Sequence, residues 1–180
     1  MIPFADTLRR MVALFEACGV AYAVIGGMAI VARVRMRTTG DIDAIVAASP
    51  LQMDAVARHA GAFGFELDTS QPELAALGLC KLLPLGGADG PTVDILLPDN
   101  AFETQLLVRA TALSLAGQQV QVATAEDLLL LKLAANRNVD IEDVFAIKDA
   151  LGSSLNMPYV RQQAAILRVT DRLELYFGRG

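Results

Sequence analysis

The chain has 180 residues, 54% of them hydrophobic, and a formal net charge of −5. This length favours one compact domain with a buried core and room for a small helical extension. The acidic balance argues against a broad, non-specific nucleic-acid-binding surface, which needs many cations. A membrane-spanning helix needs about 20 consecutive apolar residues, and the longest apolar run, residues 18–32, is shorter. Residues 1–6 lack the features of a secretory signal, so we expect a cytoplasmic protein without membrane contact.

The first part of the chain predicts a helix, a strand, a second helix and a second strand. Apolar residues at helical spacing, ended by a glycine, predict the first helix. A short buried strand then leads through Gly26-Gly27 into the second helix, and a polar loop precedes the second strand. In chain order these elements are a helix over residues 4–18, a strand over 21–25, a helix over 28–34, a loop over 35–40 and a strand over 41–46.

The rest of the chain contains further helices and strands and becomes helical at its end. Two apolar strands flank the turn-rich residues 86–91 and predict a β-hairpin whose second strand contains Asp94. Thr124 and the acidic residues after it are typical of a helix start. The predicted elements are a helix over 51–63, strands over 65–68, 79–85 and 92–97 with a loop over 69–73, a helix over 99–110, a strand pair over 111–122, and helices over 128–135, 140–151 and 159–177.

This order of elements predicts an α+β fold, in which a small mixed or antiparallel β-sheet is flanked by helices. Residues 1–122 contain all of the predicted strands and would form the core of the fold. Residues 123–180 would form a C-terminal helical extension that packs on this core.

Asp41 and Asp43 are the first residues that indicate chemistry. They lie two residues apart in a strand, so their side chains project from the same face. Two carboxylates about 4 Å apart repel by roughly 1 kcal/mol in water and by about 4 kcal/mol at an effective dielectric of 20. Mg²⁺ or Mn²⁺ would remove this conflict, and such hard cations are usually held by a few carboxylates together with substrate phosphates. The solvated face of an edge strand would explain the same pattern without a metal.

Gly26-Gly27 favours the metal interpretation. A backbone without Cβ atoms lets phosphate oxygens approach closely. The helix that follows offers unpaired N–H groups and the positive end of its dipole, both of which favour an anion. Glycines also form ordinary turns, but a glycine pair shortly before Asp-x-Asp predicts that phosphates and metal ligands share one site.

These patterns resemble the motifs of the DNA-polymerase-beta-like nucleotidyltransferase superfamily. Its first motif is a hydrophobic strand, Gly-Gly or Gly-Ser, and then Asp-x-Asp. The matching segments are Tyr22-Ala-Val-Ile-Gly-Gly-Met-Ala-Ile and Arg37-Thr-Thr-Gly-Asp-Ile-Asp43. The third carboxylate of the superfamily lies on a later apolar strand, matched by Thr92-Val-Asp94-Ile-Leu-Leu. Because Gly27 stands where some members have serine, no hydroxyl at this position helps to bind phosphate.

The helical extension resembles one branch of this superfamily, the AbiEii-like nucleotidyltransferases of type IV toxin systems and stand-alone proteins. This resemblance rests on Ala123-Thr-Ala-Glu-Asp-Leu-Leu-Leu-Leu-Lys132-Leu-Ala-Ala-Asn-Arg137-Asn-Val-Asp140-Ile-Glu-Asp143. Together the two resemblances cover about residues 10–150. They imply a possible toxin-type enzyme with an antitoxin protein as partner.

The resemblance implies a catalytic and metal-binding role for three carboxylates. Asp41 and Asp43 would bind the metal ions, Mg²⁺ or Mn²⁺, that bridge a nucleoside triphosphate. Asp94 would be a further ligand and would help to activate the acceptor hydroxyl. The in-line attack on the α-phosphate that follows is typical of two-metal sites.

The nucleotide would be bound by residues on both sides of this carboxylate motif. Lys132 could instead be a cation on an exposed helix face. Asp140 and Asp143 could fix Lys132 or Arg137 through ion pairs, although acidic residues in the first turn of a helix also stabilise it without any catalytic role, and we favour that second interpretation. The predicted nucleotide-binding residues are Gly26, Gly27, Arg37, Thr39, Lys132 and Arg137.

The function predicted from the sequence is transfer of a nucleoside monophosphate to an acceptor hydroxyl with release of pyrophosphate. The acceptor could be RNA such as tRNA, a protein or a small molecule, and the resemblance implies that the helices after Thr124 bind it. An inactive nucleotide-binding or protein-interaction module of the same fold is the alternative, and metal-dependent phosphoester hydrolysis is a third. All three aspartates are present, which supports an active enzyme.

Overall fold

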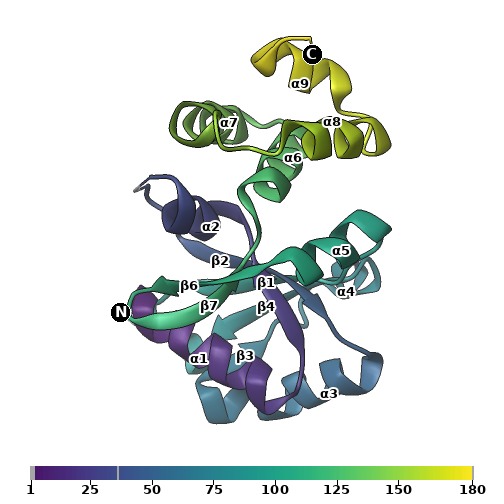
Figure 1. Cartoon of the computed structure of the whole chain (residues 1–180). Helices are drawn as coiled ribbons and strands as arrows, with labels where there is room; N and C mark the ends of the chain where they lie inside the picture. The colour runs from purple at the N-terminus through teal and green to yellow at the C-terminus, as the bar shows by residue number, and fades with distance from the viewer. Residues whose placement is uncertain (1–2, 36, 180) are drawn as a thin grey trace.

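The computed structural model describes residues 3–35 and 37–179, which contain one mixed β-sheet with helices on both faces (Figure 1). The strands are β1 (Ala21–Val24), β2 (Asp41–Ala47), β3 (Phe65–Leu67), β4 (Leu79–Pro84), β5 (Thr92–Leu96), β6 (Thr111–Leu115) and β7 (Gln118–Val122). Their order across the sheet is β3-β4-β5-β2-β1-β7-β6. β1 pairs with β7 and β2 with β5 in parallel, and the other neighbours are antiparallel. The predicted α+β fold is confirmed.

Helix starts follow the capping chemistry of the sequence. The side-chain oxygens of Ser49, Asn100 and Thr124 each accept a hydrogen bond from the backbone N–H three residues later, as N-caps do. The helices are α1 (Phe4–Ala17), α2 (Gly26–Arg33), α3 (Pro50–His59), α4 (Pro72–Ala76), α5 (Ala101–Arg109), α6 (Ala125–Ala135), α7 (Asn138–Leu151), α8 (Met157–Ile166) and α9 (Thr170–Phe177), with the short 3-10 helices η1 (Ala60–Phe63) and η2 (Leu85–Gly87).

Several predicted boundaries differ from the structure. Gly26-Gly27 forms the first turn of α2 and is not a separate turn before it. Pro72, which favours the first position of a helix, begins α4 inside the predicted loop 69–73. The predicted helix over 159–177 is two helices, because Arg168 adopts a left-handed conformation with φ +58° between α8 and α9. Residue 36 of the predicted loop 35–40 lies outside the described residues.

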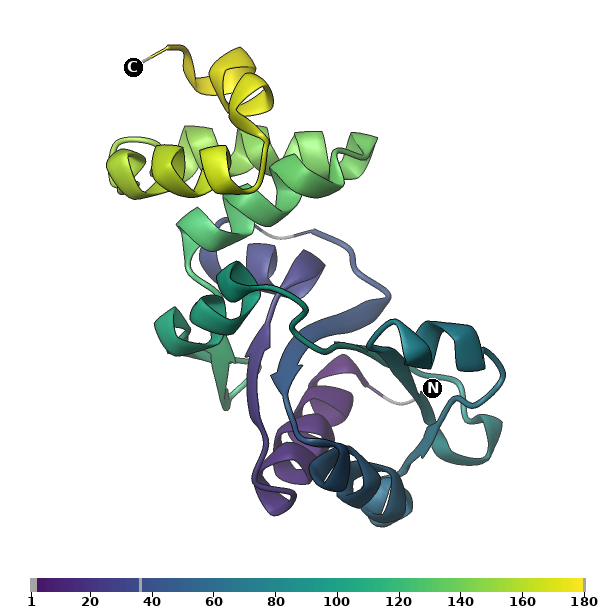
Figure 2. The same ribbon diagram turned by 90° about the vertical axis from the view of Figure 1, so that its right-hand side faces the viewer.

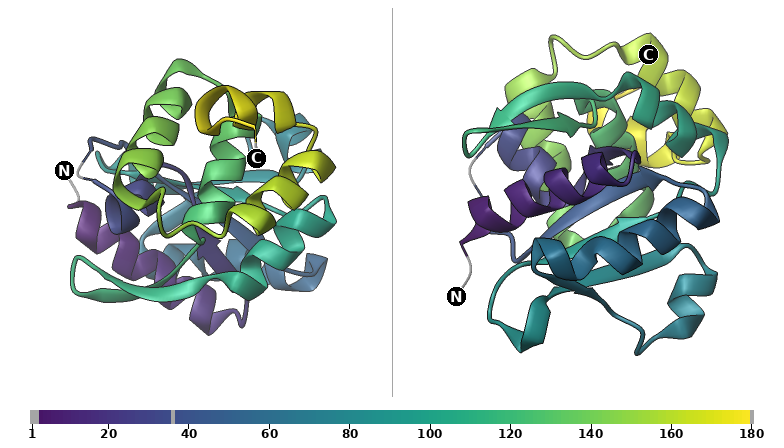
Figure 3. Two further views of the ribbon diagram at one scale, coloured as in Figure 1. Left: turned by 45° about the horizontal axis from the view of Figure 1, so that its top comes forward. Right: turned by 90° about the horizontal axis from the view of Figure 1, so that it is seen from below.

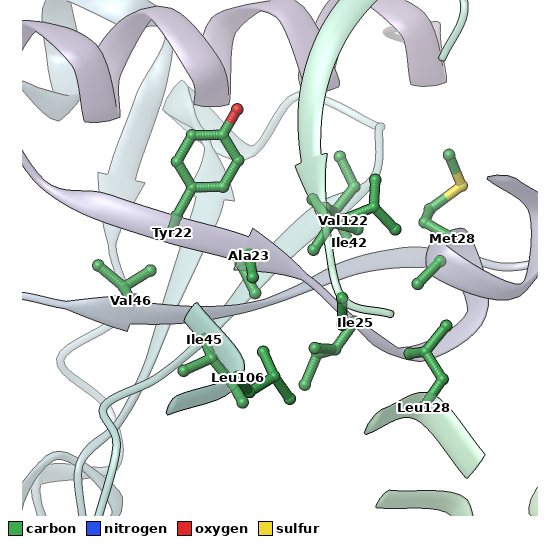
Figure 4. Packing of buried hydrophobic residues seen from close by; sticks show 14 of the residues in the cluster. Tyr22, Ala23, Ile25, Met28, Ile42, Ile45, Val46, Leu106, Val122 and Leu128 are labelled. Carbon is green, nitrogen blue, oxygen red and sulfur yellow. The ribbon is translucent and has the colours of Figure 1, made fainter. Parts of the chain in front are cut away.

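The two faces of the sheet are covered by different helices. Figure 3 shows α1 and α3 crossing the face seen from below. Tyr22 of β1 points toward this layer, where its ring lies 5.4 Å from that of Phe15 in α1. Successive strand residues face opposite sides, so Ile45 of β2 points the other way, toward Leu106 of α5 (Figure 4). Asp43 shares the face of Ile45, so the α5 side of the sheet carries the predicted carboxylates.

The helices after β7 stack at one end of the molecule. Figures 1 and 2 show α6 to α9 together, away from α1 and α3. Leu128 of α6 is fully buried and lies beside Ile25 (Figure 4), and both residues line the same cavity. The predicted boundary between a core of residues 1–122 and a helical segment of residues 123–180 falls between β7 and α6, and this division stays a prediction. None of the helices in the described part of the chain has the length and apolarity to span a membrane.

Candidate active site

Three aspartates meet at the centre of the sheet. β2 is the fourth of the seven strands in the described sheet, so Asp41 and Asp43 do not lie on an edge strand. The parallel pairing of β2 with β5 places Asp43 directly beside Asp94. One carboxylate oxygen from each of the three residues lies within 4.8 Å of the others. The structure therefore brings together all three predicted carboxylates.

The electrostatics of this cluster favour a bound cation. Burial raises the pKa of Asp43, and the negative charges of Asp41 and Asp94 raise this pKa further. Lys132 and the Gly27 backbone N–H act in the opposite direction and lower the pKa of Asp43. Asp94 Oδ1 is buried and accepts no hydrogen bond. Carboxylate oxygens that repel one another, including one that lies near the Lys81 ammonium but accepts no hydrogen bond, fit the ligand preference of Mg²⁺ or Mn²⁺.

The glycine pair lies against this cluster. Gly26 adopts φ +59°, and a Cβ atom there would lie 1.9 Å from Asp43 Oδ2. A Cβ atom on Gly27 would lie 2.8 Å from Thr39 Oγ1. Thr39 Oγ1 is in turn 3.2 Å from Asp41 Oδ1, to which it donates a hydrogen bond. The glycines therefore permit α2 to approach the carboxylates closely, and their predicted contact with phosphate remains a prediction.

Two buried aspartates of α7 hold the predicted cations in place. Lys132 is only 6% exposed, and its Nζ lies 2.9 Å from Asp140 Oδ1 and 3.0 Å from Asp143 Oδ2. Arg137 Nε lies 2.7 Å from Asp140 Oδ2, and Arg37 pairs with Asp143. Lys132 is therefore not a cation on an exposed helix face. Asp140 and Asp143 form ion pairs with the predicted cations. The favoured interpretation from the sequence, that these two aspartates only stabilise the first turn of a helix, is therefore wrong.

The pKa of Asp140 reflects these contacts. Burial alone would raise it, but the hydrogen bonds from Arg137 and Lys132 outweigh burial and lower the pKa to about 2. The carboxylate is therefore charged at neutral pH. A charged, fully buried carboxylate fixes the position of both cations beside the aspartate cluster.

Two cavities adjoin the cluster. The first, which we call the glycine cavity, has a volume of about 420 Å³ and is lined by the six predicted nucleotide-binding residues, by Asp41 and Asp43, and by side chains of α6 and α7. The second, which we call the α4 cavity, has a volume of about 310 Å³ and lies between α4, β4 and β5. It contains Asp43 and Asp94 together with Asp68, Gln71, Leu74, Leu79, Cys80, Lys81, Ile95 and Leu96.

Lys81 is the residue near the cluster that the sequence analysis missed. It pairs across β4 and β5 with Asp94, and its Nζ lies 3.0 Å from Asp94 Oδ1. The two atoms are not aligned for a hydrogen bond, so the contact is electrostatic. The signal in the sequence was a single lysine inside the apolar strand of the predicted hairpin, and that signal does not reveal the strand register.

Comparison with known proteins places the chain among the nucleotidyltransferases. It belongs to the family described as nucleotidyl transferase of unknown function (DUF2204), whose profile matches residues 4–172. No curated protein matches the chain. The predicted enzyme class is thereby confirmed, whereas the family match does not identify the AbiEii-like branch.

Solved structures share the fold across most of the chain. An antigenic nucleotidyltransferase-like protein from Paracoccidioides brasiliensis is 17% identical with a TM-score of 0.55, and the match covers 97% of each chain. The lincosamide antibiotic adenylyltransferase LnuA, with lincomycin bound, is 16% identical with a TM-score of 0.57 over 82% of this chain and 97% of its own. ANT(2″)-Ia in complex with adenylyl-2″-tobramycin is 17% identical with a TM-score of 0.58, and the match covers 91% of this chain and 96% of its own. At these identities the matches establish the nucleotidyltransferase fold.

Proposed function

We propose that this protein moves a nucleoside monophosphate from a nucleoside triphosphate to an acceptor hydroxyl and releases pyrophosphate. The observation that carries the proposal is the setting of the cluster of Asp41, Asp43 and Asp94. The glycine pair at the start of α2 lies against this cluster, and nearby cations are held by buried carboxylates. A triphosphate with divalent metal ions needs both kinds of group, because oxygen ligands bind the metal and cations neutralise the phosphates.

The aspartate cluster and the predicted nucleotide-binding residues of the glycine cavity each have a role in this proposal. Asp41, Asp43 and Asp94 would hold the metal ions, which supply charge neutralisation and polarise phosphate oxygens when bound. Lys132 and Arg137 would neutralise the triphosphate from the side of α6 and α7. Arg37 and Thr39, in the loop before β2, would line the nucleotide site. Gly26 and Gly27 would let the phosphates approach the backbone.

The reaction requires little covalent chemistry from the protein. The acceptor oxygen attacks the α-phosphorus and forms a new P–O bond, while the bond to the bridging oxygen of the β-phosphate breaks. The electron pair of that bond leaves with pyrophosphate. The proton of the acceptor hydroxyl passes to the carboxylate of Asp94 and then to solvent. Positioning and charge stabilisation provide the rate enhancement.

The finer parts of the proposal rest on similarity. LnuA is an antibiotic adenylyltransferase, and the ANT(2″)-Ia structure contains adenylyl-2″-tobramycin. ATP is therefore the first nucleotide to test, and a small molecule is the first acceptor. The resemblance of residues 123–143 to the AbiEii-like branch supports a toxin-type enzyme in the cytoplasm, with RNA or protein as acceptor and an antitoxin protein as partner. Both possibilities use the same carboxylates.

The proposal is tested by incubating the protein with Mg²⁺ or Mn²⁺ and each of the four ribonucleoside triphosphates labelled on the α-phosphate. Total tRNA, cell protein, lincomycin and tobramycin serve as acceptors. We expect metal-dependent label in one acceptor class, lost in Asp41→Asn and Asp43→Asn. Asp54→Asn, which changes an exposed aspartate on α3, serves as the matched control and should retain the activity.

Other outcomes decide between the alternatives. Release of labelled monophosphate without a labelled acceptor would indicate phosphoester hydrolysis. Metal-dependent triphosphate binding by calorimetry without any turnover would support the inactive nucleotide-binding module. Absence of triphosphate binding would contradict the proposed site.

A further inference from the structure

The three aspartates are divided between the two cavities. Asp41 lines the glycine cavity, Asp94 lines the α4 cavity, and Asp43 lines both. The cations Arg37, Lys132 and Arg137 all belong to the glycine cavity. A nucleotidyltransferase must bring two different substrates to one cluster, and two cavities with largely different linings adjoin this cluster.

We propose that the α4 cavity binds the acceptor, and that the acceptor is a compact small molecule with a hydroxyl group and an apolar surface. This inference rests on the proposed function, which places the triphosphate in the glycine cavity. It also differs from the expectation that the helices after Thr124 bind the acceptor, since no residue of α6 to α9 lines the α4 cavity. Figures 1 and 2 show α4 apart from α7 to α9.

The size of the α4 cavity favours a small molecule. Its volume of about 310 Å³ is at the lower end of the roughly 300–1,000 Å³ typical of small-molecule sites. Leu74, Leu79 and Leu96 give it apolar walls, and such walls bind an apolar surface by removing it from water. A hydroxyl group on the same molecule would then lie beside Asp94.

The charges of the α4 cavity argue against RNA. Among the described residues that line it, Lys81 is the one cation, and this lysine already lies 3.0 Å from Asp94. The carboxylates Asp43, Asp68 and Asp94 outnumber it. With metal ions bound, the charges of Asp43 and Asp94 would be neutralised, which leaves Asp68 and Lys81 as the charged residues of the wall. A polyanion needs several cations to neutralise its phosphates, and this wall does not offer them. Asp68 accepts a hydrogen bond from the Ser70 backbone N–H and forms no ion pair within the described residues, so its carboxylate can also accept one basic group of a small acceptor.

The chemistry in the α4 cavity is the acceptor half of the proposed reaction. The acceptor O–H oxygen forms the bond to the α-phosphorus, and its proton passes to Asp94. The pyrophosphate leaves on the side of the glycine cavity, where Lys132 and Arg137 lie. The two substrates thus enter from different sides and meet at Asp43.

The test fills the α4 cavity and leaves the glycine cavity intact. Leu74→Trp places a large ring in the cavity. Leu77→Trp makes the same change three residues later, at a side chain that is 72% exposed and does not line the cavity. The chain contains three tyrosines and no tryptophan, so indole fluorescence excited at wavelengths that tyrosine does not absorb reports only the introduced ring. Leu79→Trp, at a partly exposed position of β4, is a second filling variant should Leu74→Trp not fold.

Two measurements follow for each variant. Saturation-transfer NMR with a library of small aryl and alkyl alcohols and amino alcohols reports acceptor binding without turnover. Calorimetry with Mg²⁺ and ATP reports nucleotide binding. We expect the wild type and Leu77→Trp to bind members of the library. The filling variants should lose that binding at least about tenfold, while all variants bind the nucleotide equally.

The outcomes separate this inference from the proposed function. The proposal that the α4 cavity binds the acceptor is overturned if the wild type binds no member of the library. It is also overturned if the filling variants bind the library as well as the wild type does. Label that enters tRNA or cell protein equally in the wild type and in a filling variant also overturns it. In each of these cases, nucleotide binding by the wild type would still support the proposed function. A wild type that binds no nucleotide would contradict the proposed function itself.

Discussion

Single side chains and single missing side chains determine the geometry of the site. Gly26 combines a left-handed backbone with the close approach of Asp43, so the position excludes a side chain for two independent reasons. Thr39 supports Asp41, and Lys81 faces Asp94. Each of the three aspartates therefore lies against a different neighbour.

Gly26→Ala should abolish binding of metal and triphosphate. The left-handed conformation alone costs a residue with a Cβ atom about 1–2 kcal/mol, and the new Cβ atom would displace Asp43. Gly87→Ala is the matched control, because Gly87 has φ +69° but a Cβ atom there would meet no other atom within 4 Å. Denaturant unfolding should show a loss of stability in both variants, and calorimetry should show lost binding in the first alone. Equal nucleotide affinity in both variants would contradict this interpretation.

At the scale of elements, the α6–α7 pair is connected by a buried ion-pair network. Lys132 lies near the end of α6, and Asp140 and Asp143 lie at the start of α7. Isolated buried charges are costly, whereas paired ones fix a geometry. The network therefore orients both helices and holds the predicted cations at the glycine cavity.

Asp140→Asn should lower the free energy of unfolding by about 3 kcal/mol at neutral pH, because it removes one partner of a buried ion pair. The pKa of Asp140 is lowered in the folded state from its ordinary 3.8 to about 2. The stabilisation is therefore complete above the unfolded-state pKa and is lost as the pH falls from about 4 to about 2. Denaturant titrations across this range should show a steeper loss for the wild type than for the variant.

Asp149→Asn is the control for this pH dependence. Asp149 lies on the same helix but is exposed, so its replacement should leave both the stability and its pH dependence close to those of the wild type. An equally steep acid loss in the Asp140→Asn variant would exclude Asp140 as the cause.

The order of elements and the Asp41–Asp43 pair could be predicted because both depend on short-range patterns. Asp94 was assigned to the cluster by the resemblance to the nucleotidyltransferase superfamily, since the pairing of β2 with β5 that places it beside Asp43 is not a local pattern. The contact of Lys81 with Asp94 depends instead on the register of β4 against β5, which no local pattern fixes. The break at Arg168 was missed because arginine seldom adopts a left-handed conformation and no glycine marks the end of α8.

The burial of Lys132 could not be predicted from local patterns either. A lysine within an apolar helix is compatible with an exposed face or with a buried ion pair. The outcome depends on Asp140 and Asp143, which lie on the next helix and meet Lys132 only after α6 and α7 have packed. Tertiary packing, and not helix periodicity, decides the environment of this side chain.

At the scale of the whole molecule, the C-terminal helices and the sheet share the glycine cavity. α6 packs against α2, and its buried Leu128 lies beside Ile25, the residue before the glycine pair (Figure 4). If residues 123–180 pack on the core as predicted, the two parts should unfold together. The nucleotide cavity would then exist only while both are folded.

Leu128→Ala tests this cooperativity. The side chain is fully buried, and removal of such a leucine costs about 2–5 kcal/mol. We expect one unfolding transition at lower denaturant, with hydrogen exchange increased equally in the sheet and in α6 to α9. Leu175→Ala, at a side chain that is 75% exposed on α9, should have little effect. Increased exchange confined to α6 to α9 would show that the helices form a separate unit.

The sharing of the aspartates between two cavities has a consequence for how this protein can change over time. The glycine cavity is built mainly from residues 25–43 and 128–140, and the α4 cavity mainly from residues 68–81 and 94–96. Among the residues that the structure describes, Asp43 and Leu96 are the two that line both. Substitutions in one segment therefore leave most of the other wall untouched. Gene duplication followed by substitutions in residues 68–81 would change the acceptor, while binding of the nucleoside triphosphate stays the same. Directed evolution can use the same independence of the two cavities.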